Sequence, residues 1–285
     1  MRIPFRLVDV FTDRPLAGNQ LCVIPQPVAL PGVLMQAIAN EIGFSETTFV
    51  TEASGSRYSM RIFTPTLELS FAGHPSLGTA FVLVSEGRIQ SPAVQTLPSG
   101  EFAMEVDLES GFARMEQLPP KFGPTVENRA GAARAIGLVE ADLDEGLPVQ
   151  IVSTGWPNMI VPVRDEAIVA RATPDIRALR ALMEPLGTDN CYLFAASGPS
   201  VKARMFTYDP GIVEDPATGG AAGPLGAYLV HHGAAEIGRI TISQGAELGR
   251  PSVLLVDVLD GEAGLRVLVG GGVVRVAEGF FDPPD

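Results

Sequence analysis

Three side chains that can move or hold a proton occur beside apolar segments of the chain: Glu46, His74 and Asp215. Glu46 precedes the apolar run that continues to Val50, and a carboxyl withdrawn from water there could both donate and accept a proton near neutral pH. His74 follows Gly73 at an expected helix start, where a neutral imidazole could relay a proton or hydrogen-bond a substrate. Each residue also has a purely structural interpretation: an exposed strand-edge glutamate, a capping or core histidine, and an aspartate that caps a helix.

The surroundings of His74 and Asp215 resemble each other. Residues 61–64 and 204–207 share the pattern Arg-x-Phe-Thr about half a chain apart, and each is followed by a glutamate and a small-residue helix start, where Asp215 takes the place of His74. We interpret this echo as an internal duplication, with coincidence as the alternative. Two such helix N-termini facing each other across a cleft would offer backbone N–H groups to a carboxylate, so an acidic protein could bind an anion without a basic patch.

The elements that must position these residues follow from hydrophobic periodicity and turn residues. Apolar residues at helical spacing predict a helix that opens at Pro31-Gly32 and ends before Gly43, which suits a left-handed C-terminal cap. A later helix is expected over 173–186, with Thr173 as its N-cap and Pro174 as its first residue. The remaining expected segments are strands over 5–10, 44–51 and 58–63, an apolar run at 21–24, and a helix over 128–138.

Composition indicates how much structure the chain can build. It has 285 residues, of which 46% are hydrophobic and 19% charged, which suffices for one large domain or two modest ones and excludes disorder. Its 31 glycines and 24 prolines follow no repeat and favour many short strands and tight turns. Residues 118–124, with three prolines and a glycine, suit neither a strand nor a helix and are the best candidate for a domain boundary.

Charge and motif content narrow the possible partners. A net charge of −13 makes nucleic acid and anionic membranes poor candidates, because an acidic chain repels phosphate groups. The sequence has no apolar run near the ~20 residues of a membrane span, no apolar signal-peptide core at its start and only two cysteines, which together favour the cytoplasm. We expect no metal and no cofactor, because C-x-x-C and H-E-x-x-H motifs are absent and residues 270–272, Gly-Gly-Gly, favour a strand bend over a phosphate loop.

Several motifs, in order along nearly the whole chain, resemble the phenazine-biosynthesis isomerase (PhzF-like) family. They are Val8-Asp9-Val10-Phe11-Thr12, Gly18-Asn19, residues 43–50, Arg61 to Pro65, residues 71–80, residues 214–219, Gln244-Gly245 and Gly249-Arg250-Pro251. The resemblance implies an α/β (α+β) protein with two pseudo-symmetric domains of the diaminopimelate-epimerase-like fold, each a curved, mostly antiparallel sheet around a central helix. We expect residues 1–118 plus 276–285 to form the N-terminal domain and 125–275 the C-terminal domain. The resemblance also implies an active site in the cleft between them and a homodimer.

The resemblance also implies roles for individual residues. Glu46 falls on the position of the family's general acid/base, while His74 and Asp215 fall on positions that face the substrate. The substrate-binding positions are Asn19, Gly73, Gly219 and Gly220. Gly220 is a departure, because the phenazine-pathway members carry a serine there, and the backbone donor is kept while one substrate contact is lost.

The cysteines separate this chain from the epimerase and proline-racemase relatives of the family, which use two opposed cysteines as acid and base. Here the corresponding places hold His74 and Asp215. Cys22 lies in the apolar run at 21–24, and Cys191 stands beside Tyr192, so both cysteines are expected to be buried packing residues. Racemisation by two cysteines is therefore disfavoured.

The sequence and the resemblance together favour a cofactor-independent isomerase of a small carboxylated, unsaturated substrate similar to dihydrohydroxyanthranilate. Glu46 would remove a proton from one carbon and return it to another, with His74 and Asp215 positioning the substrate. One alternative is an epimerase or lyase that acts on a small amino or hydroxy acid. Another is a protein that binds a small acid without catalysis.

Overall fold

The computed structural model describes residues 2–27, 29–70, 73–208, 212–262 and 264–282. Residues 71 and 72, which belong to one of the family motifs above, lie outside the described residues. The chain divides into two compact units, an N-terminal unit of residues 1–116 with 270–285 and a C-terminal unit of residues 117–269. No helix within the described ranges combines the length and apolar character needed to cross a membrane.

The described residues of the N-terminal unit form nine strands or strand segments and two helices. They are β1 (Ile3–Val10), β2 (Asn19–Ile24), α1 (Gly32–Ile42), β3 (Glu46–Ser54), β4 (Arg57–Phe63), β5 (Glu68–Leu69), α2 (His74–Ser85), β6 (Ala93–Leu97), β7 (Gly100–Asp107), β8 (Phe112–Glu116) and the second part of β17 (Gly264–Phe281). As expected, α1 ends at Gly43, which has a φ of 68° and donates its N–H to Ala39 O.

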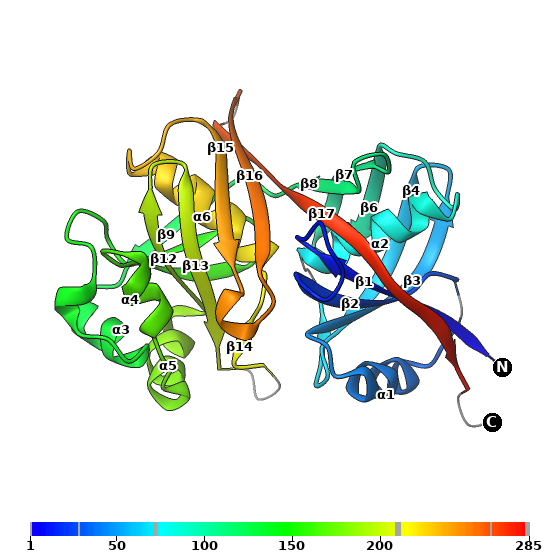
Figure 1. Ribbon diagram of the computed structural model, residues 1–285, viewed down its shortest axis with the longest axis horizontal. Helices are drawn as coiled ribbons and strands as arrows, with labels where there is room; N and C mark the ends of the chain where they lie inside the picture. Colours follow the sequence, from blue (N-terminus) through cyan, green and yellow to red (C-terminus); the bar gives the residue numbers. More distant parts are fainter. Residues whose placement is uncertain (1, 28, 71–72, 209–211, 263, 283–285) are drawn as a thin grey trace. The chain divides into compact units, whose positions relative to one another are not determined.

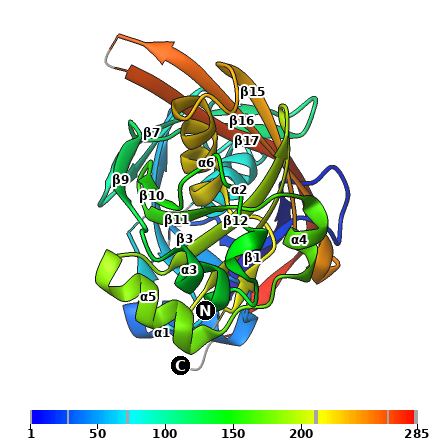
Figure 2. The ribbon, with the colours of Figure 1, turned by 90° about the vertical axis from the view of Figure 1, so that its left-hand side faces the viewer.

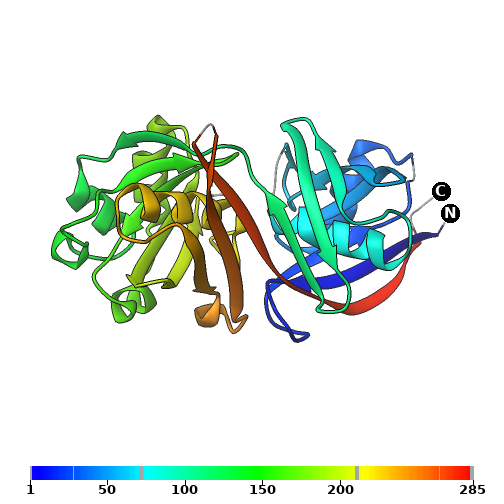
Figure 3. The same ribbon diagram turned by 90° about the horizontal axis from the view of Figure 1, so that it is seen from above.

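The strands of the N-terminal unit close on themselves around α2. Pairing runs through β8, β7, β6, β4, β3, β2, β1 and β17, and β17 pairs with β8 again. Helix α2 is buried from His74 to Leu83, and Figure 3 shows it lying among these strands. Small residues make this possible: a Cβ on Gly78 would stand 2.6 Å from Leu21 Cδ2 and 3.0 Å from Val10 Cγ2.

The C-terminal unit repeats this architecture. Its elements are β9 (Lys121–Thr125), α3 (Arg129–Ala135), β10 (Gln150–Ser153), β11 (Pro157–Pro162), α4 (Glu166–Arg171), α5 (Ile176–Met183), β12 (Asn190–Ser197), β13 (Ser200–Thr207), β14 (Glu214–Asp215), α6 (Gly219–His231), β15 (Gly238–Gln244), β16 (Ser252–Gly261) and the first part of β17. Its central helix, α6, is buried as α2 is, and Figure 2 looks onto this unit with α6 among its strands.

Strand pairing shows that the two units share one topology. The parallel pairs β2–β3 and β4–β6 of the first unit correspond to β11–β12 and β13–β15 of the second. The antiparallel hairpins β3–β4 and β12–β13 correspond in the same way (Figure 1). The Arg-x-Phe-Thr echo occupies equivalent strands, β4 and β13. The expectation of two pseudo-symmetric α/β units, each built around a central helix, is therefore confirmed.

Two local expectations were wrong. Helix α5 begins at Ile176 rather than after Thr173, because the Asp175 side chain caps it by accepting from Arg177 N–H and Ala178 N–H. The N–H groups of Thr173 and Asp175 bind carbonyls at the end of α3 instead, and α5 gives way to a 3-10 turn after Met183. Residues 121–125 form strand β9 despite Gly123 and Pro124, a sequence tolerated at the edge of a sheet.

The glycines at 270–272, for which the sequence favoured a strand bend, lie inside strand β17. Gly272 O accepts from Phe11 N–H at 2.7 Å and from Thr12 N–H at 3.1 Å. A Cβ on Gly272 would stand 2.4 Å from Thr12 O, so only glycine permits this approach.

Candidate active site

Glu46 and His74 meet inside the N-terminal unit. Glu46 is the first residue of β3, and His74 is the first residue of α2. Glu46 Oε2 lies 3.4 Å from His74 Nε2, and the two side chains are 16% and 4% exposed, respectively. Because β3 runs parallel to β2 and packs against α2, the start of the strand comes to the start of the helix. The structure thus brings together two of the three residues that the sequence singled out for proton transfer.

A chain of polar contacts orients His74 from the other side. The Ser45 hydroxyl donates to Asn19 Oδ1 at 3.0 Å, and Asn19 Nδ2 lies 3.2 Å from His74 Nδ1. With Oδ1 engaged by Ser45, the Asn19 amide nitrogen faces His74 Nδ1 and holds the ring in place. Asn19, expected to bind substrate, therefore also fixes the His74 ring.

Burial keeps His74 neutral. It lowers the pKa of His74 from 6.5 to about 3, against a smaller opposing effect of a hydrogen bond with the Gln20 backbone. The imidazole is accordingly a neutral hydrogen-bonding partner near pH 7 and carries no positive charge to share with Glu46.

The two central helices begin differently. Gly73 caps α2, but the second residue of that helix is Pro75, which has no N–H to offer a ligand. Helix α6 begins with Gly219 and Gly220, whose N–H groups precede the first intrahelical acceptor and so have no partner within the helix. Of the two helix starts, that of α6 is the better anion site.

Asp215 lies in β14 of the C-terminal unit and is buried. The expectation that Asp215 occupies the position in the C-terminal unit equivalent to that of His74 in the N-terminal unit was wrong. In the sheet Met205 pairs with Asp215 as Ile62 pairs with Leu69, so Asp215 corresponds to Leu69, one strand before the helix. The residue that corresponds to His74 as the first residue of the central helix is Gly219. Asp215 is also not the helix cap, because Thr218 holds that position.

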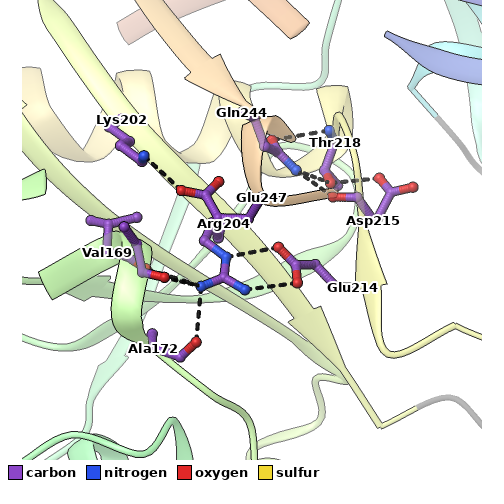
Figure 4. A network of polar contacts seen from close by, with 10 residues as sticks. Val169, Ala172, Lys202, Arg204, Glu214, Asp215, Thr218, Gln244 and Glu247 are labelled. Carbon is purple, nitrogen blue, oxygen red and sulfur yellow. Dashed lines mark hydrogen bonds and ion pairs between the residues drawn. The ribbon is translucent and has the colours of Figure 1, made fainter. Parts of the chain in front are cut away.

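Asp215 belongs to a polar network, shown in Figure 4 with neighbouring ion pairs. Thr218 donates its hydroxyl to Asp215 Oδ2 at 2.6 Å, and Gln244 Nε2 donates to the Asp215 carbonyl at 2.8 Å. Our sequence reasoning missed Thr218 and Gln244 as site residues. The signal that could have found Gln244 was its place in the motif Gln244-Gly245, to which no role had been attached.

The start of α6 is tied to its own unit through side-chain amides. Gln117 Nε2 donates to Gly219 O at 2.9 Å, and Asn158 Nδ2 donates to Gly220 O at 3.1 Å. Because each carbonyl shares a rigid peptide plane with the following N–H, these bonds fix the directions of the Gly220 and Ala221 N–H groups. The N–H of Gly220, a residue expected to bind substrate, is thereby held in one direction at the start of α6.

The cysteines take no part in either cluster. Cys22 and Cys191 are both buried, and burial raises the pKa of each thiol to about 12. A thiol held protonated in this way is a poor base near pH 7, which agrees with their expected packing role.

Comparison with known proteins identifies one family for this chain. The family model described as "Phenazine biosynthesis-like protein" matches residues 8–279. The trans-2,3-dihydro-3-hydroxyanthranilate isomerase of Pseudomonas chlororaphis is 36% identical over 283 residues, which cover 96% of this chain and 97% of that protein. A PhzF-family phenazine biosynthesis protein of Bacillus anthracis superposes with a TM-score of 0.89 at 26% identity, covering 99% of this chain and 100% of the other.

A more distant likeness concerns the fold alone. A probable proline racemase of Agrobacterium radiobacter superposes with a TM-score of 0.68 at 11% identity, covering 97% of this chain and 92% of that one. The fold is therefore the one that the PhzF proteins share with the proline racemases. With a family match that spans most of its length, the chain belongs to the phenazine biosynthesis-like (PhzF) family and is an isomerase of that family.

Proposed function

We propose that the protein moves a proton between two carbons of a small, carboxylated, unsaturated substrate, with Glu46 as general acid and base and without a cofactor. One observation carries the proposal. The Glu46 carboxyl stands 3.4 Å from a neutral imidazole, and both side chains are largely withdrawn from water. A carboxyl in such surroundings can take a proton from carbon and hold it until it is returned.

The proposed reaction needs only one proton carrier. Glu46 as a carboxylate removes a proton from one carbon of the conjugated substrate, and the electron pair shifts along the double bonds. Glu46 as the acid, whose carboxyl proton exchanges with solvent, then delivers a proton to another carbon, so the product is an isomer of the substrate and no electrons are lost or gained. His74, a neutral imidazole whose Nε2 lies 3.4 Å from Glu46 Oε2, orients the carboxyl group for this transfer.

The proposal also gives the C-terminal unit a part in the reaction. The N–H groups of Gly219 and Gly220 suit a substrate carboxylate, and Asp215 suits an amino or hydroxyl group. Gly73 and Asn19 are proposed contacts in the N-terminal unit. Because Gly220 lacks the hydroxyl that a serine would offer, a substrate that differs from the phenazine precursor at that point is compatible with this chain.

The substrate proposed for the first test is trans-2,3-dihydro-3-hydroxyanthranilate, because the relative from Pseudomonas chlororaphis is named for its isomerisation. The assay is incorporation of deuterium from heavy water, read by mass spectrometry together with product formation. Glu46→Gln should abolish both, since the amide cannot accept the proton. Glu52→Gln, an exposed change in the same strand β3, is the matched control and should leave both unchanged.

Deuterium exchange that survives in Glu46→Gln would overturn the role of Glu46. The same samples separate the alternatives. Inversion at one carbon indicates an epimerase, a product lighter by one water indicates a lyase, and binding without any exchange indicates a protein that has lost catalysis.

A further inference from the structure

Gln244 ends strand β15 in the C-terminal unit, and its buried side-chain amide is engaged at both ends. Oε1 accepts from the Tyr192 hydroxyl at 2.8 Å and from Thr218 N–H at 3.2 Å. Nε2 donates to the Asp215 carbonyl at 2.8 Å and to Thr218 Oγ1 at 3.0 Å. Because a backbone N–H can only donate and a backbone carbonyl can only accept, the amide has a single allowed orientation.

This orientation determines where the Thr218 hydroxyl points. Its oxygen already accepts from Gln244 Nε2, so its one hydrogen is directed at Asp215 Oδ2, 2.6 Å away (Figure 4). The short distance is typical of a hydroxyl that donates to a carboxylate. A directed chain of donors thus runs from Tyr192 through Gln244 and Thr218 to Asp215.

Tyr192 can serve as the start of this chain because it stays protonated. Its side chain is completely buried, and burial, followed by the negative charge of Asp215, raises the pKa of Tyr192. The hydroxyl therefore remains a donor to Gln244 over the whole working pH range.

The turn that follows Gln244 packs closely against the backbone between Asp215 and Thr218. Gly245 has a φ of +81°, and a Cβ there would stand 2.4 Å from Pro216 O and 2.4 Å from Arg250 O. Ser252 Oγ lies 3.2 Å from Pro216 O and 2.9 Å from Arg250 O. Glycine is thus needed beside Gln244 for the turn to reach the backbone between Asp215 and Thr218.

We propose that Gln244 is a positioning residue: it holds the Asp215 carboxylate in one orientation by directing the Thr218 hydroxyl toward it, and Tyr192 holds Gln244 in turn. In this proposal Gln244 does not contact the substrate. The inference rests on the proposed function only in supposing that the reaction uses Asp215; the positioning itself concerns contacts within the C-terminal unit. It assigns a physical task to the Gln244-Gly245 motif.

Four variants of the full chain test the donor chain. Thr218→Val keeps the shape of the side chain and removes the hydroxyl, whereas Thr218→Ser keeps the hydroxyl and is the conservative control. Gln244→Met keeps the volume and removes the donor that directs Thr218. The fourth variant combines Thr218→Val with Gln244→Met, and because both changes act on one chain of bonds their effects should not add.

The readout that does not depend on turnover is the carbon-13 signal of the Asp215 carboxyl, identified by its loss in Asp215→Asn and followed against pH. Thr218→Val and Gln244→Met should each raise the pH at which this signal titrates, by roughly one pH unit, because the charged carboxylate loses a donor. Thr218→Ser should stay close to the wild type. With trans-2,3-dihydro-3-hydroxyanthranilate as the probe, kcat should fall about tenfold in the first two variants and recover in Thr218→Ser, because the Asp215 carboxylate is then no longer held in one orientation.

Unchanged Asp215 titration in folded Thr218→Val and folded Gln244→Met would overturn the inference, with folding checked by urea unfolding. A shift in Thr218→Val alone would also overturn it, because Gln244 would then not direct the hydroxyl. If the titration shifts as expected while Asp215→Asn retains full turnover, the positioning by Gln244 stands and the role of Asp215 in the proposed reaction fails.

Discussion

Arg204 and Arg61 are equivalent residues of the two units and form the same ion pair at very different depths. Arg204 binds Glu214 through Nε and Nη2 at 2.7 and 2.8 Å, and Arg61 binds Glu68 through the same atoms at 2.7 Å each. The Arg204 and Glu214 side chains are 8% and 13% exposed, whereas those of Arg61 and Glu68 are 36% and 43% exposed. The protein therefore contains its own control for the effect of burial on an ion pair.

We predict that Arg204→Met destabilises the C-terminal unit by about 4 kcal/mol, because removal of one partner of a buried pair leaves an uncompensated charge on the other. Arg204 Nη1 also donates to the carbonyls of Val169, Ala170 and Ala172 at the end of α4, at 3.1, 3.0 and 2.8 Å, and these would lose their donor. Figure 4 shows this convergence on Arg204. Arg61→Met should cost only ~0–1 kcal/mol, the usual range for an exposed pair.

Each arginine also stacks on an aromatic ring. Arg204 lies 4.7 Å from the centre of the Phe206 ring, and Arg61 lies 5.0 Å from that of Phe63. The cation–π contribution is present in both units and is larger at the buried site, so it acts in the same direction as the difference expected between the two ion pairs.

The assay is equilibrium unfolding in urea, followed for the C-terminal unit by the fluorescence of Trp156, the only tryptophan of the chain, and for the N-terminal unit by hydrogen exchange of its backbone amides. Addition of Glu214→Gln to Arg204→Met should recover part of the loss, because the remaining partner is then neutral. A cost for Arg61→Met equal to that of Arg204→Met, or a cost below ~1 kcal/mol for Arg204→Met, would refute the reasoning from burial.

Two further predictions concern the N-terminal unit. The folded-state pKa of His74 is lowered to about 3 from 6.5, so its contribution to stability is complete above pH 6.5 and declines as the pH falls toward 3, where the unfolded chain alone binds the proton. The stability of the wild type should therefore fall relative to His74→Asn by up to ~1.4 kcal/mol per pH unit in that window, and parallel urea-unfolding curves for the two proteins would contradict this. Gly78→Ala should destabilise the protein by ~1–3 kcal/mol in the same assay, despite the better helix propensity of alanine, because its Cβ would stand 2.6 Å from Leu21 Cδ2. A urea midpoint above that of the wild type would show that Leu21 can move aside.

The residue pattern was sufficient for features that depend on short stretches of chain. The apolar spacing before Gly43 predicted α1 and its cap, and the Arg-x-Phe-Thr echo indicated the duplication that strand pairing confirms. The small residues near His74 and Gly219 indicated two helix starts. Such features are readable because periodicity, caps and turn chemistry are properties of neighbouring residues.

The family resemblance supplied what spacing alone did not. Glu46, His74 and Asp215 each had a structural interpretation when considered singly, and only their place in a set of motifs favoured chemistry. The family match now supports the isomerase class, while the roles of these residues stay predictions.

Other features required the folded chain. The approach of Glu46 to His74 depends on the parallel alignment of β2 and β3 beside α2, and the correspondence of Asp215 with Leu69 depends on sheet register. The side-chain amide of Gln244 hydrogen-bonds to Thr218 and Asp215, which lie 26 and 29 residues earlier in the sequence. Strand register and the closure of each sheet depend on which apolar faces pack together, and these faces come from residues far apart in the sequence. A local residue pattern therefore does not predict them. The sequence by itself therefore determined the elements and the family, whereas tertiary packing decided which polar groups touch.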